Sequence, residues 1–469
     1  MKKEPVKNEE AEQTVDVLKK CTQHIDDISF KKILTFEGIV TIVYSASLVD
    51  KMVLQTMVYI PLANYIHQIH QVSETLDLTN FEDIIAKLNA GQTLLYFHDI
   101  NKLLVIDTDS APKRAITAAE RESTMLGPQD AFTESLGTNI SLIRRRIRNP
   151  KLKNEDCVVG TEANTKISIM YMEDTVNQEY LENIRKRIEK INHPLLTDIS
   201  VLKHLIVDNP LSPFPLYYMS VRPDIISQYL IDGRIIVLMD NSQAALVCPT
   251  SFFEMFISIE DYYNHWTIAT LLRTLRFLGF FLTITITPIY ITALTFHPEI
   301  LPPDLLQNLQ ESRSKVPFPP LFEVIFIELI IEILREAGSR MPTKIGQTIG
   351  IVGGIVIGTA AVEAGLISNI LIVLVSISAL LSFLPPVILM SNTSRIIRYI
   401  FILSAGLFGL LGQVLAFAWL MIHLEHVKSL GTPFNSIVPR KFTDLLDSVI
   451  RFPTVLLIPK KGISKSQKK

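Results

Sequence analysis

Hydrophobic and polar positions divide this chain into regions of different character. Residues 1–30 are polar, and short apolar runs alternate with charged stretches over residues 31–265. Residues 266–424 carry long apolar runs, and residues 425–469 form a basic tail. The pattern predicts a flexible polar N-terminus and an α/β soluble N-terminal region, followed by an all-α polytopic membrane domain and a tail.

Strand-like and helix-like patterns alternate within residues 31–265, which is typical of α/β layers. Two apolar runs joined at Asn101 predict one hairpin, and two runs joined around Asp240 predict another. The expected strands are 94–100, 102–108, 166–172, 235–239 and 244–248, and the expected helices are 132–148, 177–191 and 224–230. The length of this region allows two small subdomains.

Four apolar runs in the second region are long enough to cross a bilayer as helices. They are residues 277–296, 345–364, 366–388 and 400–422. Arg273 and Arg276 precede the first run and acidic residues follow it, so the positive-inside rule favours a start on the cytoplasmic side. The start of the chain lacks the apolar core of a signal peptide. We therefore expect a cytoplasmic N-terminal region, and four passes return the basic tail to the same side.

One further apolar segment, residues 320–338, is rich in glutamate. Its charged residues are Glu323, Glu328, Glu332, Arg335 and Glu336, and Arg340 follows it. Because charges at mid-bilayer are costly, we interpret the segment as an interfacial helix or as a helix packed against protein. Glutamates 328, 332 and 336 share one helix face, where the two arginines are available at i+3 and i+4. We expect this helix to couple the soluble region to the membrane domain.

No single membrane topology agrees with the charges that flank every segment. If residues 320–338 span the membrane, the basic tail lands outside, against its charge. If only four segments span, Arg395 and Arg398 lie outside. The number of spans therefore stays open at this point.

The most apolar part of the chain, which we call the glycine segment (residues 345–362), has a glycine at every fourth position. The glycines are Gly346, Gly350, Gly354 and Gly358, and Val362 continues the spacing before Glu363. Such a stripe lets another backbone approach closely, so it is typical of simple helix packing in membranes. Alternatively, copies of this helix surround a pore in which Val362 forms a hydrophobic constriction. Glu363 is then either a negative ring at the mouth, favouring cations, or an ordinary charge at a helix end.

Candidate catalytic and ligand-binding residues are few. We find no phosphate-binding loop, no zinc motif and no nucleophile elbow, so neither an enzyme nor a cofactor or metal site is expected. His67 and His70 lie three apart without a third ligand, and we interpret them as surface residues. Arg144, Arg145 and Arg146 could meet a phosphate, although a solvated helix face is favoured. Three scattered cysteines predict no disulfide framework, and the net charge of −2 gives no sign of nucleic-acid binding.

Several long motifs occur in one order and together resemble a known family. They are 127–152 (GPQDAFTESLGTNISLIRRRIRNPKL), 218–242 (YMSVRPDIISQYLIDGRIIVLMDNS), 260–263 (EDYY) and 317–368, which contains the glycine segment. The chain resembles the A subunits of GerA-type spore germinant receptors over roughly residues 90–460. Ala131 departs from the glycine usual in the family.

The resemblance implies more than the residues alone indicate. Such A subunits sit in the inner membrane of the spore with a polytopic B subunit, which binds the nutrient, and a lipoprotein C subunit. They are thought to form oligomers, as pentamers, that open on nutrient binding and release cations. Their soluble region is described as two α/β subdomains similar to solute-binding proteins, and the glycine segment matches their pore-lining helix. A non-conducting scaffold for a transporter-like partner and a secondary transporter remain the alternative functions.

Overall fold

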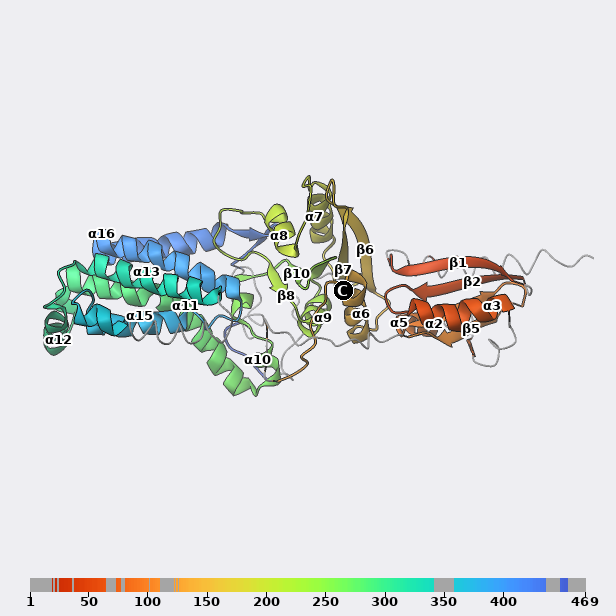
Figure 1. The fold of residues 1–469 in the computed structure, drawn as a ribbon, viewed down its shortest axis with the longest axis horizontal. Coiled ribbons are helices and arrows are strands. Elements are labelled where there is room, and N and C mark those ends of the chain that lie inside the picture. Colours follow the sequence, from red (N-terminus) through yellow and green to blue (C-terminus); the bar gives the residue numbers. More distant parts are fainter. Residues whose placement is uncertain are drawn as a thin grey trace, which may run out of the picture.

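The chain forms an elongated molecule in a computed structural model, with two sheet-containing parts followed by a bundle of helices (Figure 1). The structure describes residues 19, 22, 25–35, 38–64, 73–76, 81–100, 102–109, 122, 124, 126–340, 358–435 and 448–453. This arrangement confirms the predicted fold class, an α/β N-terminal region in two subdomains followed by an all-α region.

The first subdomain is an antiparallel sheet of order β1-β2-β4-β5-β3 with helices on both faces. The predicted hairpin is confirmed: β4 pairs with β5 from Gln92 opposite Asp107 to Phe97 opposite Lys102. Successive side chains of β4 alternate between the two faces, so Leu95 packs under α2–α3 and Leu94 under α5. The elements are β1 (Ile28–Thr35), β2 (Gly38–Ser45), α2 (Lys51–Leu54), η1 (Gln55–Tyr59), α3 (Ile60–Asn64), β3 (Glu74–Leu76), α5 (Phe81–Asn89), β4 (Gln92–Phe97) and β5 (Lys102–Asp107).

The second subdomain repeats this plan with a sheet of order β6-β7-β9-β10-β8. Helices α6 and α9 share a hydrophobic core with one face of the sheet, and α7 and α8 with the other. The elements are α6 (Leu136–Arg146), β6 (Leu152–Val159), β7 (Thr165–Met172), α7 (Gln178–Glu189), α8 (Ile199–Ile206), β8 (Tyr218–Ser220), α9 (Pro223–Ile231), β9 (Ile235–Met239), β10 (Ala245–Cys248), η3 (Phe252–Phe256) and α10 (Glu260–Tyr263). The predicted helices, the strand at 166–172 and the second hairpin are therefore present.

Arg144 joins the two subdomains, which contradicts its interpretation as part of a solvated helix face. Its Nη2 donates to Asp27 Oδ1 at 2.8 Å and to Asn154 Oδ1 at 2.6 Å. Asp27 lies just before β1, and both members of the ion pair are buried. Arg145 and Arg146 form pairs nearer the surface, with Asp109 and Asp130. The prediction failed because the pairing partner of Arg144 lies in the other subdomain.

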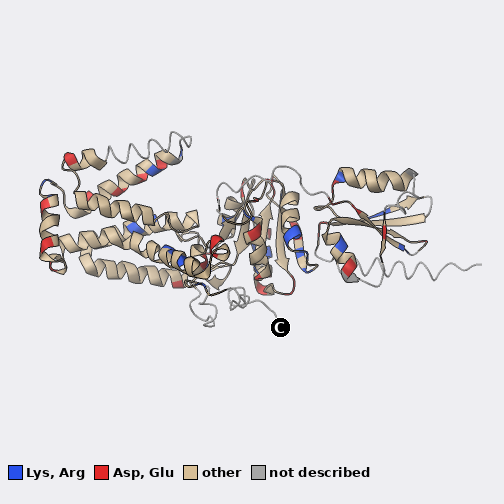
Figure 2. Cartoon of the chain, turned by 90° about the horizontal axis from the view of Figure 1, so that it is seen from below, with Lys and Arg blue, Asp and Glu red and all other residues tan. Residues whose placement is uncertain are grey.

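The helical region is apolar on its outside. Its elements are α11 (Trp266–Thr295), η4 (Pro298–Ile300), α12 (Pro303–Arg313), α13 (Pro320–Ser339), α15 (Asn369–Leu381) and α16 (Ile388–His426), followed by the short strands β11 (Lys428–Ser429) and β12 (Thr432–Pro433). Among the described residues, α11 and α16 are long and apolar enough to cross a membrane. Figure 2 shows that charged residues are sparse along this bundle compared with the two subdomains.

Helix α16 is a hairpin of two arms rather than one straight rod. Thr393 bonds to the carbonyl of Pro213, and His423 bonds to the neighbouring Ser212. A straight helix, at 1.5 Å per residue, would hold Thr393 and His423 about 45 Å apart. The chain reverses at Gly409, where φ is 60° and ψ is −134°. A Cβ there would lie 2.7 Å from the ring of Phe296, so both the backbone angle and the space require glycine.

The reversal corrects the predicted spans. Residues 400–422 are not one span, because the chain turns back within them, and the predicted span at 366–388 is divided between α15 and the start of α16. The first arm of α16 leads away from the soluble region and the second arm leads back, since both outer ends contact residues 212–213. Residues 427–435 consequently lie beside the second subdomain, where the amide of Leu430 donates to Asp208 at 2.7 Å.

One hydrophobic core runs from the second subdomain into the bundle. Phe252 and Phe256 of η3 lie 6.0 and 5.7 Å, centroid to centroid, from the ring of Phe280 in α11. The same cluster contains Phe401 and Leu420 from the two arms of α16. Because protein interiors are densely packed, the second subdomain and these helices form one mechanical unit.

Candidate functional site

Helix α13 buries two of its acidic residues and exposes several of its apolar ones. Glu323 and Glu328 are each 1% exposed, whereas Phe322, Leu329 and Ile333 are 61, 53 and 59% exposed. A helix on the surface of a soluble protein shows the opposite pattern. This arrangement suits apolar surroundings, in which charges turn inward and pair with one another. The helix runs alongside α11, α15 and α16, so of the two interpretations of residues 320–338 the structure favours packing against protein.

The innermost pair joins α13 to the first arm of α16. Glu328 Oε2 lies 2.8 Å from Arg398 Nη2, and the side chains are 0 and 1% exposed. Arg398 Nη1 donates to Ser378 Oγ on α15 at 2.9 Å, and that hydroxyl donates to the carbonyl of Thr283 on α11 at 3.1 Å. Four helices of the bundle are therefore connected through one guanidinium group.

A second pair lies one turn further along α13. Glu332 accepts from Arg395, which also donates to Asn392. Arg335 donates to Ser382 Oγ at 3.3 Å and lies 4.6 Å from the ring centroid of Phe383, within the range of a cation–π contact. We call Glu328, Glu332, Arg335, Arg395 and Arg398 the charged seam. It connects α13 to the helices behind it.

A third acidic residue, Glu323, lies at the end of the bundle remote from the subdomains. Glu323 Oε1 accepts from the amide of Ser368 at 2.6 Å, and its Oε2 accepts from Arg313 Nε at 3.1 Å. Ser368 is the N-cap of α15, and its hydroxyl accepts from the amide of Leu371 at 3.2 Å. Glu323 thus ties the start of α13 to the start of α15.

The sequence identified the acidic half of the seam but missed the basic half. We expected bonds within the helix, and these are the weaker ones: Arg335 lies 3.9 Å from Glu332, and the Glu336–Arg340 pair, at 2.6 Å, is exposed. The principal partners, Arg395 and Arg398, come from α16. Their position in an otherwise apolar run was the available signal, since buried charges in such a run need opposite charges from elsewhere.

Only the end of the glycine segment is described, as a helix over residues 358–363; Gly346, Gly350 and Gly354 lie outside the described residues. Among the described residues, a Cβ on Gly358 would meet no atom within 4 Å, whereas one on Gly406 would lie 2.5 Å from Leu321. Val362 is half-buried and Glu363 is exposed. Gly358 borders an apolar cavity of about 320 Å³ between α13 and α15. Gly358, at the described end of the stripe, therefore makes no close packing contact with the part of the chain that the structure describes.

The remaining candidates from the sequence are two histidines and the cysteines. His67 and His70 lie outside the described residues. Among the residues that the structure does describe, no group of histidine, cysteine, aspartate or glutamate side chains is arranged to hold a metal ion. Cys157 is half-buried, and burial together with the carboxylates of Asp156 and Glu155 raises the pKa of its thiol to about 11. Such a thiol is protonated at neutral pH and is a poor nucleophile.

Comparison with known proteins gives consistent matches. The model of the Bacillus/Clostridium GerA spore germination protein family matches residues 16–461. The chain is 42% identical to spore germination protein GerQA of Bacillus cereus, over 87% of this chain and 82% of that protein. It is 33% identical to spore germination protein KA of Bacillus subtilis, over 88 and 78% of the two chains.

Solved structures match as well, and one of them is similar to the N-terminal region. It is the N-terminal domain of the A subunit of the Bacillus megaterium spore germinant receptor GerK3, at 26% identity and a TM-score of 0.39. The match covers 51% of this chain and 94% of that domain.

Proposed function

We propose that this chain, which belongs to the Bacillus/Clostridium GerA family of spore germination proteins and is the A subunit of a germinant receptor, assembles with copies of itself into a gated cation channel. In this proposal it is a receptor subunit and not an enzyme. It sits in the inner membrane of the spore with a polytopic B subunit, which binds the nutrient, and a lipoprotein C subunit.

The proposed orientation places the two subdomains in the cytoplasm. The bundle leaves the soluble region with α11 and returns to it with the second arm of α16, so the described residues of the basic tail, 427–435 and 448–453, lie on the side of the subdomains. Arg273 and Arg276 lie at that same end, whereas Glu299 and Asp304 lie at the remote end of α11. Positive charge thereby gathers on one side, as expected for the cytoplasmic face.

The observation that carries the channel proposal is the open face of Gly358. Glycines that serve packing within this chain, such as Gly279 and Gly406, have a neighbouring side chain within 2.6 Å of the position of a Cβ. Within the part of the chain that the structure describes, Gly358 has none within 4 Å. The stripe of Gly346, Gly350, Gly354 and Gly358 is then available to other copies around a central pore. A pentamer is the assembly that the family resemblance implies.

Val362 and Glu363 would define the pore in this assembly. Val362 continues the glycine spacing, and a ring of its methyl groups would repel water and raise a dehydration barrier against ions. Glu363 is exposed in the single chain, and a ring of its carboxylates would favour cations at the mouth.

The charged seam would couple this pore to the rest of the protein. Helix α13 lies directly before the glycine segment in the sequence, and Glu328 and Glu332 hold it to α16. A movement of the second subdomain would reach α13 through these ion pairs, because that subdomain and α16 share one core.

Planar-bilayer recording of the purified protein tests the channel. Val362→Ala should widen the constriction and conduct without nutrient, Val362→Phe should block conduction with assembly intact, and Glu363→Gln should lower the preference for cations. Val373→Ala, on the exposed face of α15, removes the same two methyl groups and should leave the currents unchanged. If all variants behave as the wild type, the gate lies elsewhere; if no currents occur, the chain is a scaffold.

A further inference from the structure

The soluble region and the bundle meet at a joint built around one carboxylate, that of Asp261 in α10. Asp261 is fully buried. Arg276 donates to both of its oxygens, from Nη2 to Oδ1 at 2.7 Å and from Nη1 to Oδ2 at 2.9 Å. Arg273 Nε donates to Oδ2 at 3.2 Å. Because both arginines belong to α11, the carboxylate ties the last helix of the soluble region to the first helix of the bundle.

The C-terminal segment 448–453 closes this joint from another side. Thr270 Oγ1 of α11 lies 2.8 Å from the carbonyl oxygen of Arg451 and 3.1 Å from its amide nitrogen. The guanidinium of Arg451 lies 4.7 Å from the ring centroid of Tyr262, which follows Asp261 in α10. Arg451 is 2% exposed. A segment that follows the whole bundle in the sequence therefore reaches back to both helices of the joint.

This geometry fixes how α11 is turned about its own axis. Arg273 and Arg276 are three residues apart and so share one helix face. Turning α11 by about 100°, the rotation of one residue, would carry both arginines away from the carboxylate. Buried ion pairs contribute little net stability compared with apolar packing, and their best-attested role is to select one arrangement. Asp261 is suited to that role, because one group sets the rotation of a whole helix.

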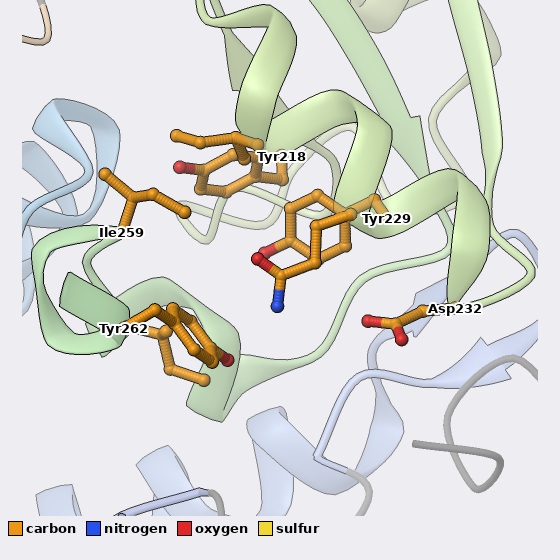
Figure 3. Close-up of a pocket in the computed structure, with 8 residues that line it drawn as sticks. Tyr218, Tyr229, Asp232, Ile259 and Tyr262 are labelled. Atoms are coloured by element: carbon orange, nitrogen blue, oxygen red, sulfur yellow. The ribbon is translucent and has the colours of Figure 1, made fainter. Parts of the chain in front are cut away.

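The joint is not packed solidly on the side of α9. A cavity of about 30 Å³ lies between α9 and α10, large enough for one water molecule. Figure 3 shows Tyr218 and Tyr229 on one side of this cavity and Ile259 and Tyr262 on the other. Tyr262 thus borders free space on one side and contacts Arg451 on the other.

We propose that Asp261 is a positioning residue for gating, and that segment 448–453 acts with it to transmit movement of the soluble region to α11. The route continues within the bundle, because the Thr283 carbonyl of α11 accepts from Ser378, which accepts from Arg398 of the charged seam. The inference rests on the proposed channel, for which it identifies the path of regulation. Nutrient binding by a partner would change the orientation of α11 through this joint.

The test uses spores in which this receptor, assembled with its partner subunits, is the only germinant receptor present. A rich nutrient broth triggers germination, and conductivity of the medium follows cation release. Asp261→Asn keeps the size of the side chain but removes its charge, and should slow release about tenfold, within the usual range of coupling between distant sites. Thr270→Val, which removes the bonds to Arg451, should slow release by a smaller factor. Wild-type rates in both variants would overturn the proposal.

A control separates this role from the loss of an ion pair elsewhere in the soluble region, at Glu155 and Arg185, whose side chains are 19 and 32% exposed. Glu155→Gln removes a carboxylate that accepts two bonds from Arg185, at 2.5 and 2.8 Å, entirely within the second subdomain. Its release rate should stay within about twofold of the wild type, which corresponds to no specific coupling. An equal slowing in Glu155→Gln and Asp261→Asn would show a general effect of stability and overturn the proposal.

Two further measurements test the proposal in case Asp261→Asn does not fold or the channel model is wrong. The double variant Asp261→Asn/Val362→Ala should keep the nutrient-independent leak of Val362→Ala; loss of the leak would assign Asp261 to assembly instead. If Val362→Ala does not leak, the pore model fails, and the joint is then tested by chemical labelling. The variant Ser448→Cys is made in purified protein that lacks its native cysteines, because the Ser448 side chain is only 4% exposed in the folded joint. Maleimide should label Cys at this position faster in Asp261→Asn than in wild type or Glu155→Gln; equal rates would overturn the proposal.

Discussion

The ion pair of Glu328 and Arg398 allows a quantitative test of the bundle. The two charged groups lie 2.8 Å apart and are almost completely buried. At an effective dielectric constant of about 20, their attraction is about 6 kcal/mol, and most of it is offset by the cost of removing both charges from water. Removing one partner leaves the other charge buried and unpaired, so the single variants Glu328→Leu and Arg398→Met should each lower the free energy of unfolding by about 3–5 kcal/mol.

The double variant distinguishes an ion pair from two independent contacts. Glu328→Leu/Arg398→Met replaces both charges by apolar groups of similar length, and its free energy of unfolding should lie within about 2 kcal/mol of the wild type, because buried pairs replaced in this way are often neutral. The measurement is unfolding of the purified protein in mixed micelles, followed by circular dichroism. Additive losses in the double variant, or single losses below about 1 kcal/mol, would refute the reasoning, since the charges would then be hydrated.

Three further predictions concern other parts of the chain. Gly354→Leu should abolish self-association measured by cross-linking in membranes, whereas Gly137→Leu, at an exposed position of α6, should not; normal assembly of the first variant would exclude the stripe as the contact. Asp27→Asn should leave Arg144 buried without its carboxylate and lower the melting temperature of the soluble region, and an unchanged melting temperature would contradict the link between subdomains. Raising the pKa of Cys157 from 9.0 to about 11 lowers its thiolate fraction at pH 8 about a hundredfold, so iodoacetamide should modify it slowly until the pH approaches 11; rapid modification at pH 8 would contradict the burial.

Local patterns in the sequence predicted the α/β region well. The strands β4, β5, β7, β9 and β10 were found because each is an apolar run of the right length bounded by turn residues. Helices α6, α7 and α9 were found from their apolar spacing. The role of Arg144 was missed, because Asp27 lies in the other subdomain and no local pattern connects the two.

The bundle was predicted less well, because its decisive contacts join residues far apart in the sequence. Glu332 and Arg395 are separated by 63 positions, so the acids of residues 320–338 gave no indication of which helix would receive them. The reversal within α16 was missed because hydropathy measures only how apolar a run is, and residues 400–422 are apolar throughout. The three glycines at 406, 409 and 412 were the available sign of a turn.

The turn at Gly409 also bears on how the protein is inserted during its synthesis. The apolar run around it contains no charged residue between Arg398 and His423. Hydropathy alone therefore does not indicate to the insertion machinery that this run consists of two separate helices. If this run were inserted as one straight helix, the last part of the chain would reach the opposite side of the membrane. It would then be separated from Thr270 and Arg273, which bind segment 448–453 in the folded protein. In the proposed membrane arrangement, the backbone of one residue thus separates two topologies, of which only one completes the fold.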